Sequence, residues 1–509
     1  MSNTSILDSI YFKDAEEVKK KSYDYIVVGG GAYGTSFVHR MLELNPKCKI
    51  LLLEKGSMLL PEHYQTLSRA YQNVFNSTTE QPWVMSQAPY NVHGQIPYLG
   101  GRALYWNAWV PKPTEAMLRD WPLDVVEGLK PEWAAVDKLI GRSTTLDVNG
   151  HNGDFHKIMR QRLFESLDKI PSCDYYDRAS ALDGAMATRS SQPDKSWLRF
   201  APVSVLIDAI NKYPDNVDVV INCEAQSLVK GKKGISQIVT AQGTIDVKKA
   251  KVILALGIIE AVTLVKPQFP ENKLLGRNFT GHFRSQIFIR VPKKAAGVDG
   301  SLLQIAALYQ SGMAVEREYH THICCIYNPQ GKKQADELYK VTPYPLFMDL
   351  FMDPEYVYFE LHAMAEIKSE RNAASTNYIS VKDGITKINF KLEKPELELW
   401  DTVDEVVVQA AEIMADGHRI EYLQSDNKTW SAKAPNMTAM RDYSLVHESG
   451  VMWMGKTAKD SVTDSWGKMH ETDNMYVLGG AVFPTCGSWN PTYTGIAMTY
   501  RLARKFAGK

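Results

Sequence analysis

The sequence predicts an α/β protein in which a parallel-sheet domain is interleaved with an antiparallel-sheet domain. Three observations lead to this fold class. An apolar segment near residue 24 runs into a glycine-rich turn and a helical pattern, a similar apolar segment with a following glycine lies near residue 251, and apolar and polar residues alternate through much of 285–435. Because the two parallel-type segments lie far apart in the chain, we expect the first domain to be assembled from distant pieces.

The composition is that of an ordinary globular protein: 509 residues, 44% of them hydrophobic and 23% charged. The 58 basic and 58 acidic residues cancel, which argues against nucleic acid or an anionic membrane as a partner. The first twenty residues contain no apolar core of signal-peptide length, and the six cysteines are scattered without a disulfide or C-x-x-C pattern. We therefore expect a cytoplasmic protein.

One stretch, residues 474–500, carries no charge and is long enough to raise the question of a membrane span. Pro484, Asn490, Pro491 and several glycines interrupt it. It is therefore predicted to form a strand, a loop and a helix, with no membrane span.

The first unit begins with a predicted strand at residues 24–28, which leads directly into a glycine turn and a helix. Gly29, Gly31 and Gly34 match the pattern G-x-G-x-x-G. The first glycine allows a tight turn, the second lets a pyrophosphate approach the backbone, and the third lets helix and strand pack closely. The helix N-terminus then offers free N–H groups to the phosphates.

A second predicted strand at residues 49–53 ends at Glu54, where a carboxylate accepts hydrogen bonds from ribose hydroxyls. The complete βαβ unit with its acidic terminus predicts a dinucleotide site. The alternative is a glycine turn that joins strand and helix in a fold without a nucleotide. The pattern does not distinguish FAD from NAD, because both place a pyrophosphate and a ribose there.

A second glycine-rich turn lies at residues 99–107, where Gly100 and Gly101 precede Tyr105 and Trp106. Such a segment suits a backbone that closes over a flat ring, although a plain turn flanked by core aromatic residues explains it equally well. Residues 251–256 form another apolar run, followed by glycine, and predict a further buried parallel strand.

The C-terminal part holds two further segments, H-x-x-G from His447 and N-P-T-x-T from Asn490. Asn490 followed by Pro491 predicts a helix start, with asparagine as the N-cap and proline in the first position. The positive end of that helix dipole is therefore expected at Asn490. Each residue also has a structural interpretation: a lone histidine is more often a hydrogen-bonded structural residue than a base, and Asn490 is explained by capping alone.

These segments together resemble the glucose-methanol-choline (GMC) oxidoreductase family, from about residue 22 to 507. The 43 positions between His447 and Asn490 fit the family's active-site pair, a histidine followed by histidine or asparagine. Leu478-Gly479-Gly480 and the N-P-T segment are similar to the pyranose-oxidase-like branch. The other motifs that carry the resemblance are the glycine fingerprint, the turn at 100–101, and Gly276-Arg277-Asn278 with His282.

The resemblance implies bound FAD and oxidation of an alcohol at a CH–OH carbon, with hydride transfer to flavin N5. It also implies an FAD-binding Rossmann-like domain interleaved with an antiparallel-sheet substrate (cap) domain. The chemistry of the residues agrees, because removing the hydroxyl proton eases hydride loss and the imidazole of His447 titrates in the right range for a base. Asn490 can donate a hydrogen bond to the developing alkoxide, with the helix start behind it.

The same resemblance implies which residues bind the cofactor: Gly29, Gly31, Ala32, Tyr33, Gly34, Glu54, Lys55, Gly100, Gly101, Arg102, Tyr105, Trp106, Asn107, Ala225, Gly257, Gly480, Ala481, Pro491 and Thr492. Two positions depart from the family. Val451 stands where a small hydroxyl residue is usual, and Tyr105 stands where some pyranose-oxidase-like members tether the flavin through a histidine. We therefore expect FAD to be bound noncovalently.

We expect the FAD-binding domain to be discontinuous, comprising residues 22–113, 200–284 and 436–509, and the substrate domain to comprise 114–199 and 285–435. In the family, an antiparallel sheet such as the one predicted at 285–435 forms the cap over the flavin. Residues 344–352 are rich in aromatic side chains and methionine, and three interpretations stay open: a lid over the substrate, an oligomer contact, or core.

Three further histidines are candidates for a role. His282 is predicted to be structural or to support the cofactor. His320 and His322 share one face of a predicted strand, but no acidic or cysteine residue stands at ligand spacing, so no metal site is predicted.

Several alternatives remain open at the level of sequence. The substrate is a small-molecule alcohol, which could be a sugar, a glycoside or an aromatic or other natural-product alcohol, and either oxygen or a quinone-like acceptor would reoxidise the flavin. An oligomer is compatible with the sequence. The alternative function is an FAD-containing lyase or other non-redox enzyme on the same fold, and a third is a nucleotide-binding interaction protein without catalysis.

Overall fold

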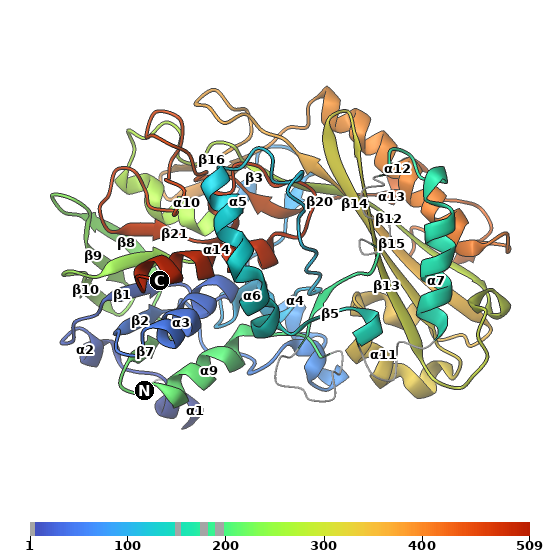
Figure 1. Ribbon diagram of the computed structural model, residues 1–509, viewed down its shortest axis with the longest axis horizontal. Helices are drawn as coiled ribbons and strands as arrows, with labels where there is room; N and C mark the ends of the chain where they lie inside the picture. The colour runs from blue at the N-terminus through green and yellow to red at the C-terminus, as the bar shows by residue number, and fades with distance from the viewer. Residues whose placement is uncertain (1–5, 148–153, 174–181, 189–197) are drawn as a thin grey trace.

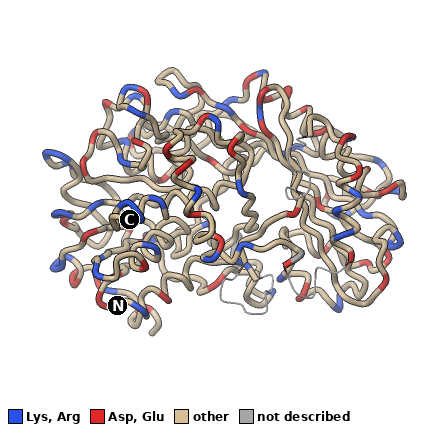
Figure 2. Tube along the Cα trace, viewed as in Figure 1, with Lys and Arg blue, Asp and Glu red and all other residues tan. Residues whose placement is uncertain are grey.

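A computed structural model describes residues 6–147, 154–173, 182–188 and 198–509 (Figure 1). Figure 1 shows a parallel sheet with its helices on the left and a long antiparallel sheet on the right. Basic residues (Lys and Arg) and acidic residues (Asp and Glu) are interspersed along the trace (Figure 2), in line with the balanced composition. Within the described residues, none of the helices combines the length and the apolar composition that a membrane span requires.

The parallel sheet is assembled from three parts of the chain that lie far apart in sequence, 25–53, 217–254 and 475–477. Its strands are fully paired in parallel, and nearly every residue in them is buried. Sheets of this kind need cover on both faces, and α3 (Ala32–Leu44) packs against both α9 (Pro202–Lys212) and α14 (Pro491–Phe506). The strand order is β21 (Met475–Val477), β11 (Lys251–Leu254), β1 (Tyr25–Val28), β2 (Ile50–Leu53), β7 (Val217–Val220).

Gly34 lets α3 lie close to the parallel sheet. A Cβ atom at this position would lie 2.0 Å from the carbonyl oxygen of Gly29 and 3.2 Å from the Cβ atom of Ala255. The contact with Gly29 is with backbone, which cannot rotate away. The third glycine of the fingerprint is therefore required for packing between helix and sheet.

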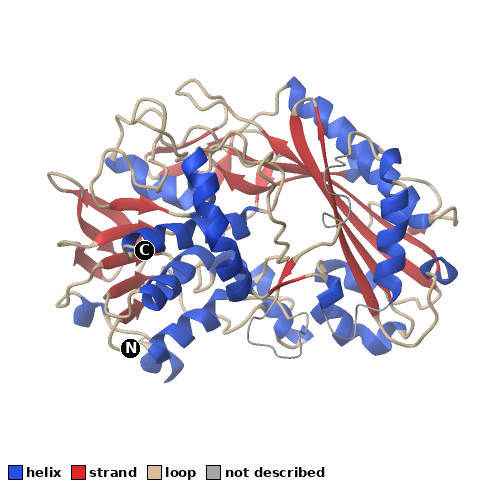
Figure 3. Ribbon diagram, in the orientation of Figure 1, coloured by secondary structure: helices blue, strands red, loops and turns tan. Residues whose placement is uncertain are grey.

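Among the described residues, the antiparallel sheet has eight strands, of which one pair is parallel, and most of these strands fall within 285–435, where the sequence predicts such a sheet. Its long strands pair in register over most of their length. Helices α12 (Lys394–Ala415) and α7 (Asp154–Glu165) pack against it and against each other (Figure 3). The strand order is β13 (Gln304–Ala314), β14 (Arg317–Tyr327), β15 (Tyr356–Ile367), β12 (Thr280–Pro292), β18 (Glu421–Leu423), β19 (Trp430–Ser431), with β20 (Arg441–Ser449) paired to β12 and β4 (Asn91–Val92) paired to β20.

Shorter elements complete the fold. A three-stranded sheet that no sequence pattern predicted consists of β8 (Ala225–Lys230), β9 (Ile235–Thr240) and β10 (Gly243–Asp246), with α10 (Ile259–Val265) against β8. Further strands and helices are β16 (Tyr378–Lys382), β17 (Ile385–Asn389), β3 (Trp83–Met85), β5 (Arg142–Ser143), β6 (Met186–Ala187), α1 (Ile6–Tyr11), α2 (Ala15–Val18), α4 (Val74–Thr78), α11 (Ala335–Val341) and α13 (Met437–Met440).

The interleaved α/β fold predicted from the sequence is confirmed, while the expected domain boundaries stay a prediction. Within the expected substrate segment 114–199, α7 packs on the antiparallel sheet, whereas α5 (Leu123–Leu129) and α6 (Trp133–Ile140) pack on α14. Parts of that segment lie outside the described residues. Strand β20 belongs to the antiparallel sheet although it falls within the expected FAD-binding segment 436–509.

Replacing Gly34 by alanine is expected to destabilise the fold, because the new methyl group would overlap the Gly29 carbonyl. Overpacking of this kind costs about 1–3 kcal/mol of unfolding free energy. Gly31→Ala is the matched control in the same turn, since a Cβ there meets only the Gly100 carbonyl oxygen at 4.0 Å. Thermal unfolding of the protein stripped of bound nucleotide measures both variants, and an equal loss of stability would contradict the assignment.

Candidate active site

A cavity of about 1000 Å³ lies between the two sheets. On the parallel-sheet side, Val28 and Glu54 line it at the carboxyl ends of β1 and β2. On the antiparallel-sheet side, Arg284, His322 and His447 line it from β12, β14 and β20. This volume is at the upper end for small-molecule sites, so the cavity has room for more than one small ligand.

The N-terminus of α3 lies at one end of the cavity, called the nucleotide end here because the sequence predicts a nucleotide site there. Gly31 is its N-cap and offers no side chain to the first-turn amides. Gly31, Ala32 and Tyr33 all line the cavity, and the space beside the Gly31 backbone is open. An uncapped helix start with an open glycine beside it suits a phosphate group.

Glu54 follows β2 and is 6% exposed. Its Oε2 atom accepts a hydrogen bond from Gly30 N at 2.7 Å, and its Oε1 atom accepts one from Gly56 N at 3.0 Å. Burial raises the pKa of this carboxyl, and the hydrogen bonds from the two amides oppose the rise. Each oxygen retains a second lone pair, which fits a ribose hydroxyl.

Lys55 and Ala225 line the same end of the cavity. The Lys55 ammonium forms an ion pair with Glu224 at 3.1 Å. Gly257 follows β11 with φ of 90°, and Glu260 in the first turn of α10 also faces the cavity. Burial raises the pKa of the Glu260 carboxyl, and its attraction to the guanidinium of Arg102 opposes the rise.

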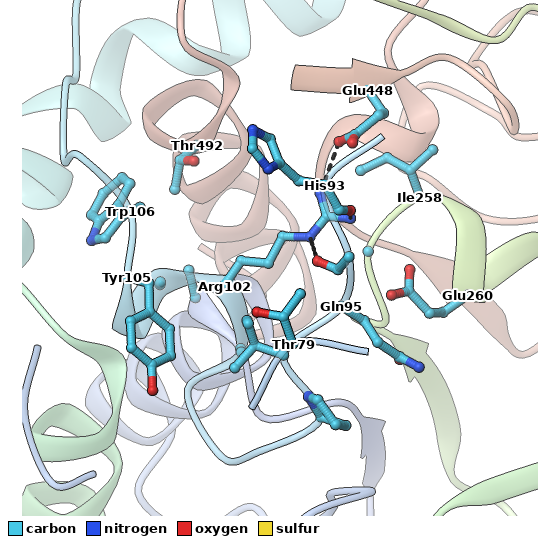
Figure 4. A pocket seen from close by; sticks show the side chains of 18 of the residues that line it. Thr79, His93, Gln95, Arg102, Tyr105, Trp106, Ile258, Glu260, Glu448 and Thr492 are labelled. Carbon is cyan, nitrogen blue, oxygen red and sulfur yellow. Dashed lines mark hydrogen bonds and ion pairs between the residues drawn. The ribbon is translucent and has the colours of Figure 1, made fainter. Parts of the chain in front are cut away.

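Arg102 extends across the middle of the cavity wall (Figure 4). Its guanidinium donates to Glu448 Oε2 at 2.9 Å and to the carbonyl oxygens of His93 at 2.7 Å and Gly94 at 3.1 Å. Glu448 is the residue after His447 and is 3% exposed. Arg102 therefore ties the second glycine turn to the strand that carries the candidate base.

The aromatic residues of the second glycine turn line the cavity, as do Gly101 and Asn107. The Tyr105 hydroxyl lies 3.2 Å from Thr78 Oγ1, and Trp106 Nε1 donates to the Phe200 carbonyl oxygen at 3.1 Å. Both rings are thus fixed along the wall (Figure 4). Such a wall suits a flat ring.

His447 lies on β20 at a bulge in its pairing with β12 and has a backbone φ of 59°. Residues other than glycine rarely adopt this left-handed conformation, and such strain concentrates at functional sites. The imidazole lines the cavity, and its Nε2 atom lies 3.1 Å from Nδ2 of Asn490. Two residues 43 positions apart are therefore brought into hydrogen-bond contact.

Asn490 is the N-cap of α14, but its side chain makes no capping hydrogen bond. Its backbone begins the helix, while its amide lies between two histidines. Oδ1 is 3.1 Å from His322 Nε2, and Nδ2 is 3.1 Å from His447 Nε2. The backbone of Asn490 thus occupies the N-cap position, while its side-chain amide contacts the two histidines.

His282 of β12 lies directly behind His447. The two Nδ1 atoms are 2.8 Å apart, and His282 Nε2 is 2.7 Å from the carbonyl oxygen of Gly487. Burial lowers the pKa of His282 to about 4 and lowers the pKa of His447 well below its ordinary value. Both imidazoles are therefore neutral at physiological pH.

Val451, which departs from the family pattern, is fully buried, and its carbonyl oxygen accepts a hydrogen bond from Gly276 N at 2.9 Å. The position therefore contributes to packing, and His447 is held by His282.

His320 and His322 lie on the same face of β14, as predicted, and both are buried. The part of the chain that the structure describes contains no group of three or more histidine, cysteine, aspartate or glutamate residues arranged to hold a metal ion. The ring of His322 is stacked on Trp109 with centroids 4.1 Å apart, and its Nδ1 atom is 2.8 Å from the Tyr344 hydroxyl. His322 therefore belongs to the surroundings of Asn490.

The predicted site residues line one cavity, except Gly34, Gly100, Gly480 and Ala481. Gly34 serves helix packing, and Gly100, with φ of 102°, forms the turn. The carbonyl oxygens of Gly480 and Ala481 accept hydrogen bonds from Gly450 N and Met452 N.

Other cavity residues were not predicted as site residues. Arg284 and Gln286 of β12 and His362 and Met364 of β15 alternate along their strands. Their period of two is visible in the sequence, but which face meets a ligand is not. His93 and Gln95 lie in a loop that carries no recognisable signal.

Residues 344–352 contribute both to the cavity wall and to the core, and a lid or an oligomer contact stays a prediction. Tyr344 and Leu346 line the cavity, and Leu346 is 65% exposed. Met348 and Phe351 are buried in the core. The first half of the segment therefore forms cavity wall and the second half forms core.

Comparisons with known proteins identify similar sequences and a similar fold. The GMC oxidoreductase family model for the C-terminal region matches residues 373–499. The chain is 38% identical over 61 residues to 6'''-hydroxyparomomycin C oxidase of Streptomyces lividus, 28% identical over 126 residues to glucose oxidase of Penicillium chrysogenum, and 39% identical over 62 residues to paromamine 6'-oxidase of Streptomyces fradiae. These matches cover 12%, 23% and 12% of this chain and only 11%, 20% and 12% of the relatives' lengths.

A solved structure, pyridoxine 4-oxidase from Mesorbium loti, has a similar fold over nearly the whole chain. The TM-score is 0.63 at 14% sequence identity, with 96% of this chain and 100% of that chain covered. At this identity the likeness concerns the fold alone. The family model matches the segment that carries both His447 and Asn490, and in this segment the chain is similar to GMC oxidoreductases.

Proposed function

We propose that this protein is an FAD-dependent alcohol oxidase or dehydrogenase that converts a CH–OH group to a carbonyl. The observation that carries the proposal is the contact between His447 Nε2 and Asn490 Nδ2 on the wall of a cavity that also contains a nucleotide-type helix start. A neutral imidazole nitrogen beside an amide donor is suited to remove a hydroxyl proton and stabilise the oxygen that remains.

The residues around the cavity fit FAD, which GMC oxidoreductases generally use. The open backbone at Gly31 and the start of α3 would hold the pyrophosphate, and the carboxylate of Glu54 would hold the ribose. Tyr105 and Trp106 would lie along the flat ring. Bound FAD would supply the two-electron hydride acceptor. Because Tyr105 stands where some pyranose-oxidase-like members tether the flavin through a histidine, we propose noncovalent binding.

His447 and Asn490 would act together on the substrate hydroxyl. In the structure the single lone pair of His447 Nε2 accepts from Nδ2 of Asn490 across 3.1 Å, and both residues line the cavity. The substrate hydroxyl would replace this contact, donating its proton to Nε2 and receiving a hydrogen bond from Nδ2. As the O–H bond breaks, Asn490 stabilises the developing alkoxide. The start of α14 at Pro491 and Thr492 adds positive potential on the same side.

The substrate is proposed to be a polyhydroxylated or aromatic alcohol. The relatives are named as oxidases of glucose, 6'''-hydroxyparomomycin C and paromamine, which favours a sugar or glycoside and oxygen as the acceptor. Polar groups at Arg284, Gln286 and Asp442, together with aromatic groups at Trp109 and Phe347, line the substrate side of the cavity. The pyranose-oxidase-like branch, a quinone-like acceptor and a cytoplasmic location stay predictions.

The experiment that tests the function is anaerobic reduction of the purified protein by a panel of sugars, glycosides and aromatic alcohols. At least one alcohol is expected to bleach the flavin absorbance and to yield the corresponding carbonyl product. A flavin that no alcohol bleaches would favour the alternative, an FAD-containing lyase or other non-redox enzyme on this fold.

His447→Ala is expected to lower turnover by about 10²–10⁴ while the protein stays yellow, because the variant loses the proton acceptor but not the groups at the nucleotide end. Turnover and flavin absorbance are measured together. His418→Ala, in the turn after α12 and not part of the cavity wall, is the control and should retain wild-type turnover. Unchanged turnover in the His447 variant would refute the assignment of the base.

Because burial lowers the pKa of His447 well below 6.5, the imidazole is the neutral, proton-accepting form throughout the neutral range. We therefore expect kcat/KM to stay nearly constant between about pH 8 and pH 6 and to fall only in more acidic solution. A base with an ordinary histidine pKa would lose about three-quarters of its active form by about pH 6. An acidic limb near the ordinary value would contradict this prediction, with circular dichroism confirming the fold at each pH.

A further inference from the structure

We propose that His322 and Tyr344 are positioning residues that hold the side-chain amide of Asn490 in one orientation, with its NH₂ group toward His447 and the cavity. The inference rests on the proposed function and adds two residues to it. It is carried by a continuous series of contacts: Tyr344 hydroxyl to His322 Nδ1 at 2.8 Å, His322 Nε2 to Asn490 Oδ1 at 3.1 Å, and Asn490 Nδ2 to His447 Nε2 at 3.1 Å.

The direction of this series is determined at its far end. The Gly487 carbonyl oxygen can only accept, so His282 Nε2 must donate to it across 2.7 Å. A neutral imidazole carries one N–H, so His282 Nδ1 is an acceptor, and His447 Nδ1, 2.8 Å away, is the donor to it. The remaining nitrogen of His447, Nε2, is therefore unprotonated and is the atom that meets Asn490.

The same reasoning continues through Asn490 to Tyr344. An unprotonated His447 Nε2 requires the amide nitrogen of Asn490 to face it, which leaves Oδ1 facing His322. Oδ1 can only accept, so His322 Nε2 carries the N–H. His322 Nδ1 is then an acceptor, and the Tyr344 hydroxyl donates to it. Every group in the series has one consistent role, which is what makes such a network rigid.

The surroundings of His322 keep it neutral and in place. The residue is 1% exposed, and its ring is parallel to that of Trp109, with an interplanar angle of 4°. The Tyr344 ring is stacked on His362 with centroids 4.0 Å apart. Burial and the neighbouring His362 lower the pKa of His322 well below its ordinary value, so the ring keeps a single N–H.

The orientation of Asn490 matters most during the reaction. When His447 Nε2 has accepted the substrate proton, it becomes an N–H donor and repels the NH₂ group of Asn490. An unrestrained amide would then rotate to place Oδ1 against the new N–H, and the developing alkoxide would lose its donor. The hydrogen bond from His322 to Oδ1 opposes that rotation. Tyr344 in turn opposes a change of tautomer at His322.

Three variants test this. His322→Phe removes both ring nitrogens but keeps a ring against Trp109, and Tyr344→Phe removes only the hydroxyl. Each is expected to slow anaerobic flavin reduction, by between about 10- and 100-fold for His322→Phe and less for Tyr344→Phe, since loss of a direct oxyanion donor costs 10²–10³. The substrate dissociation constant should change little. His322→Gln, which retains an N–H donor, is expected to restore most of the rate.

Tyr309→Phe is the matched control. Its hydroxyl is buried beside the same histidines, with centroids 5.7 Å from His322, and has no hydrogen-bond partner in the described structure. Removing it should leave the reduction rate within about twofold of wild type. A loss equal to that of Tyr344→Phe would show that any hydroxyl deletion there disturbs the site, and would overturn the inference.

A second measurement does not depend on activity. Nitrogen-15 NMR of histidine-labelled protein, with resonances assigned by their absence in the single variants, is expected to show N–H at Nε2 of His322 and at Nδ1 of His447. A protonated His322 or the opposite tautomer would overturn the inference. If the wild type is reduced by no alcohol, the proposed function fails and this inference with it. If the wild type is active and His322→Phe and Tyr344→Phe react within about twofold of it, only this inference fails.

Discussion

The 3.1 Å contact between His447 and Asn490 depends on holding two separate sheets at a constant separation. His447 is carried by β20 of the antiparallel sheet, and Asn490 begins α14, which packs on α3 beside the parallel sheet. The two parts are joined where the chain leaves β20: the amides of residues 450, 452 and 454 donate to the carbonyl oxygens of residues 480, 481 and 482. Asn278 adds hydrogen bonds to the carbonyl oxygens of Gly450 and Pro484.

Gly480 and Ala481 belong to this junction and do not line the cavity. A Cβ atom added at Gly480 would lie 3.2 Å from the carbonyl oxygen of Glu448. A larger residue at this position would therefore press on the strand that carries His447. The left-handed backbone of His447 is maintained in the same region, at a cost on the order of 1–3 kcal/mol. Hydrogen bonds on both ring nitrogens offset part of that cost and determine where the imidazole faces.

Burial of neutral imidazoles is the second physical theme of the site. Around the cavity, His282, His322, His362 and His447 all have lowered pKa values because burial disfavours the charged form. A neutral imidazole has one donor and one acceptor, so hydrogen bonds between such rings carry a direction. A charged imidazole would donate from both nitrogens, and the hydrogen bonds between the rings would then have no defined direction. The low polarity of the interior therefore makes the orientation of the site well defined.

The sequence by itself determined the local units: strands, glycine turns and the start of α14 follow from apolar runs, from Gly29, Gly31 and Gly34, and from Asn490 followed by Pro491. Local patterns are sufficient there because the chemistry of each turn depends on neighbouring residues. Only the tertiary structure decided that Asn490 directs its amide away from its own helix, that His282 lies behind His447, and that His322 and Tyr344 lie beyond Asn490. Those contacts join residues on different strands and on a helix, and which face of each strand meets the cavity depends on sheet pairing and register, which periodicity alone does not specify.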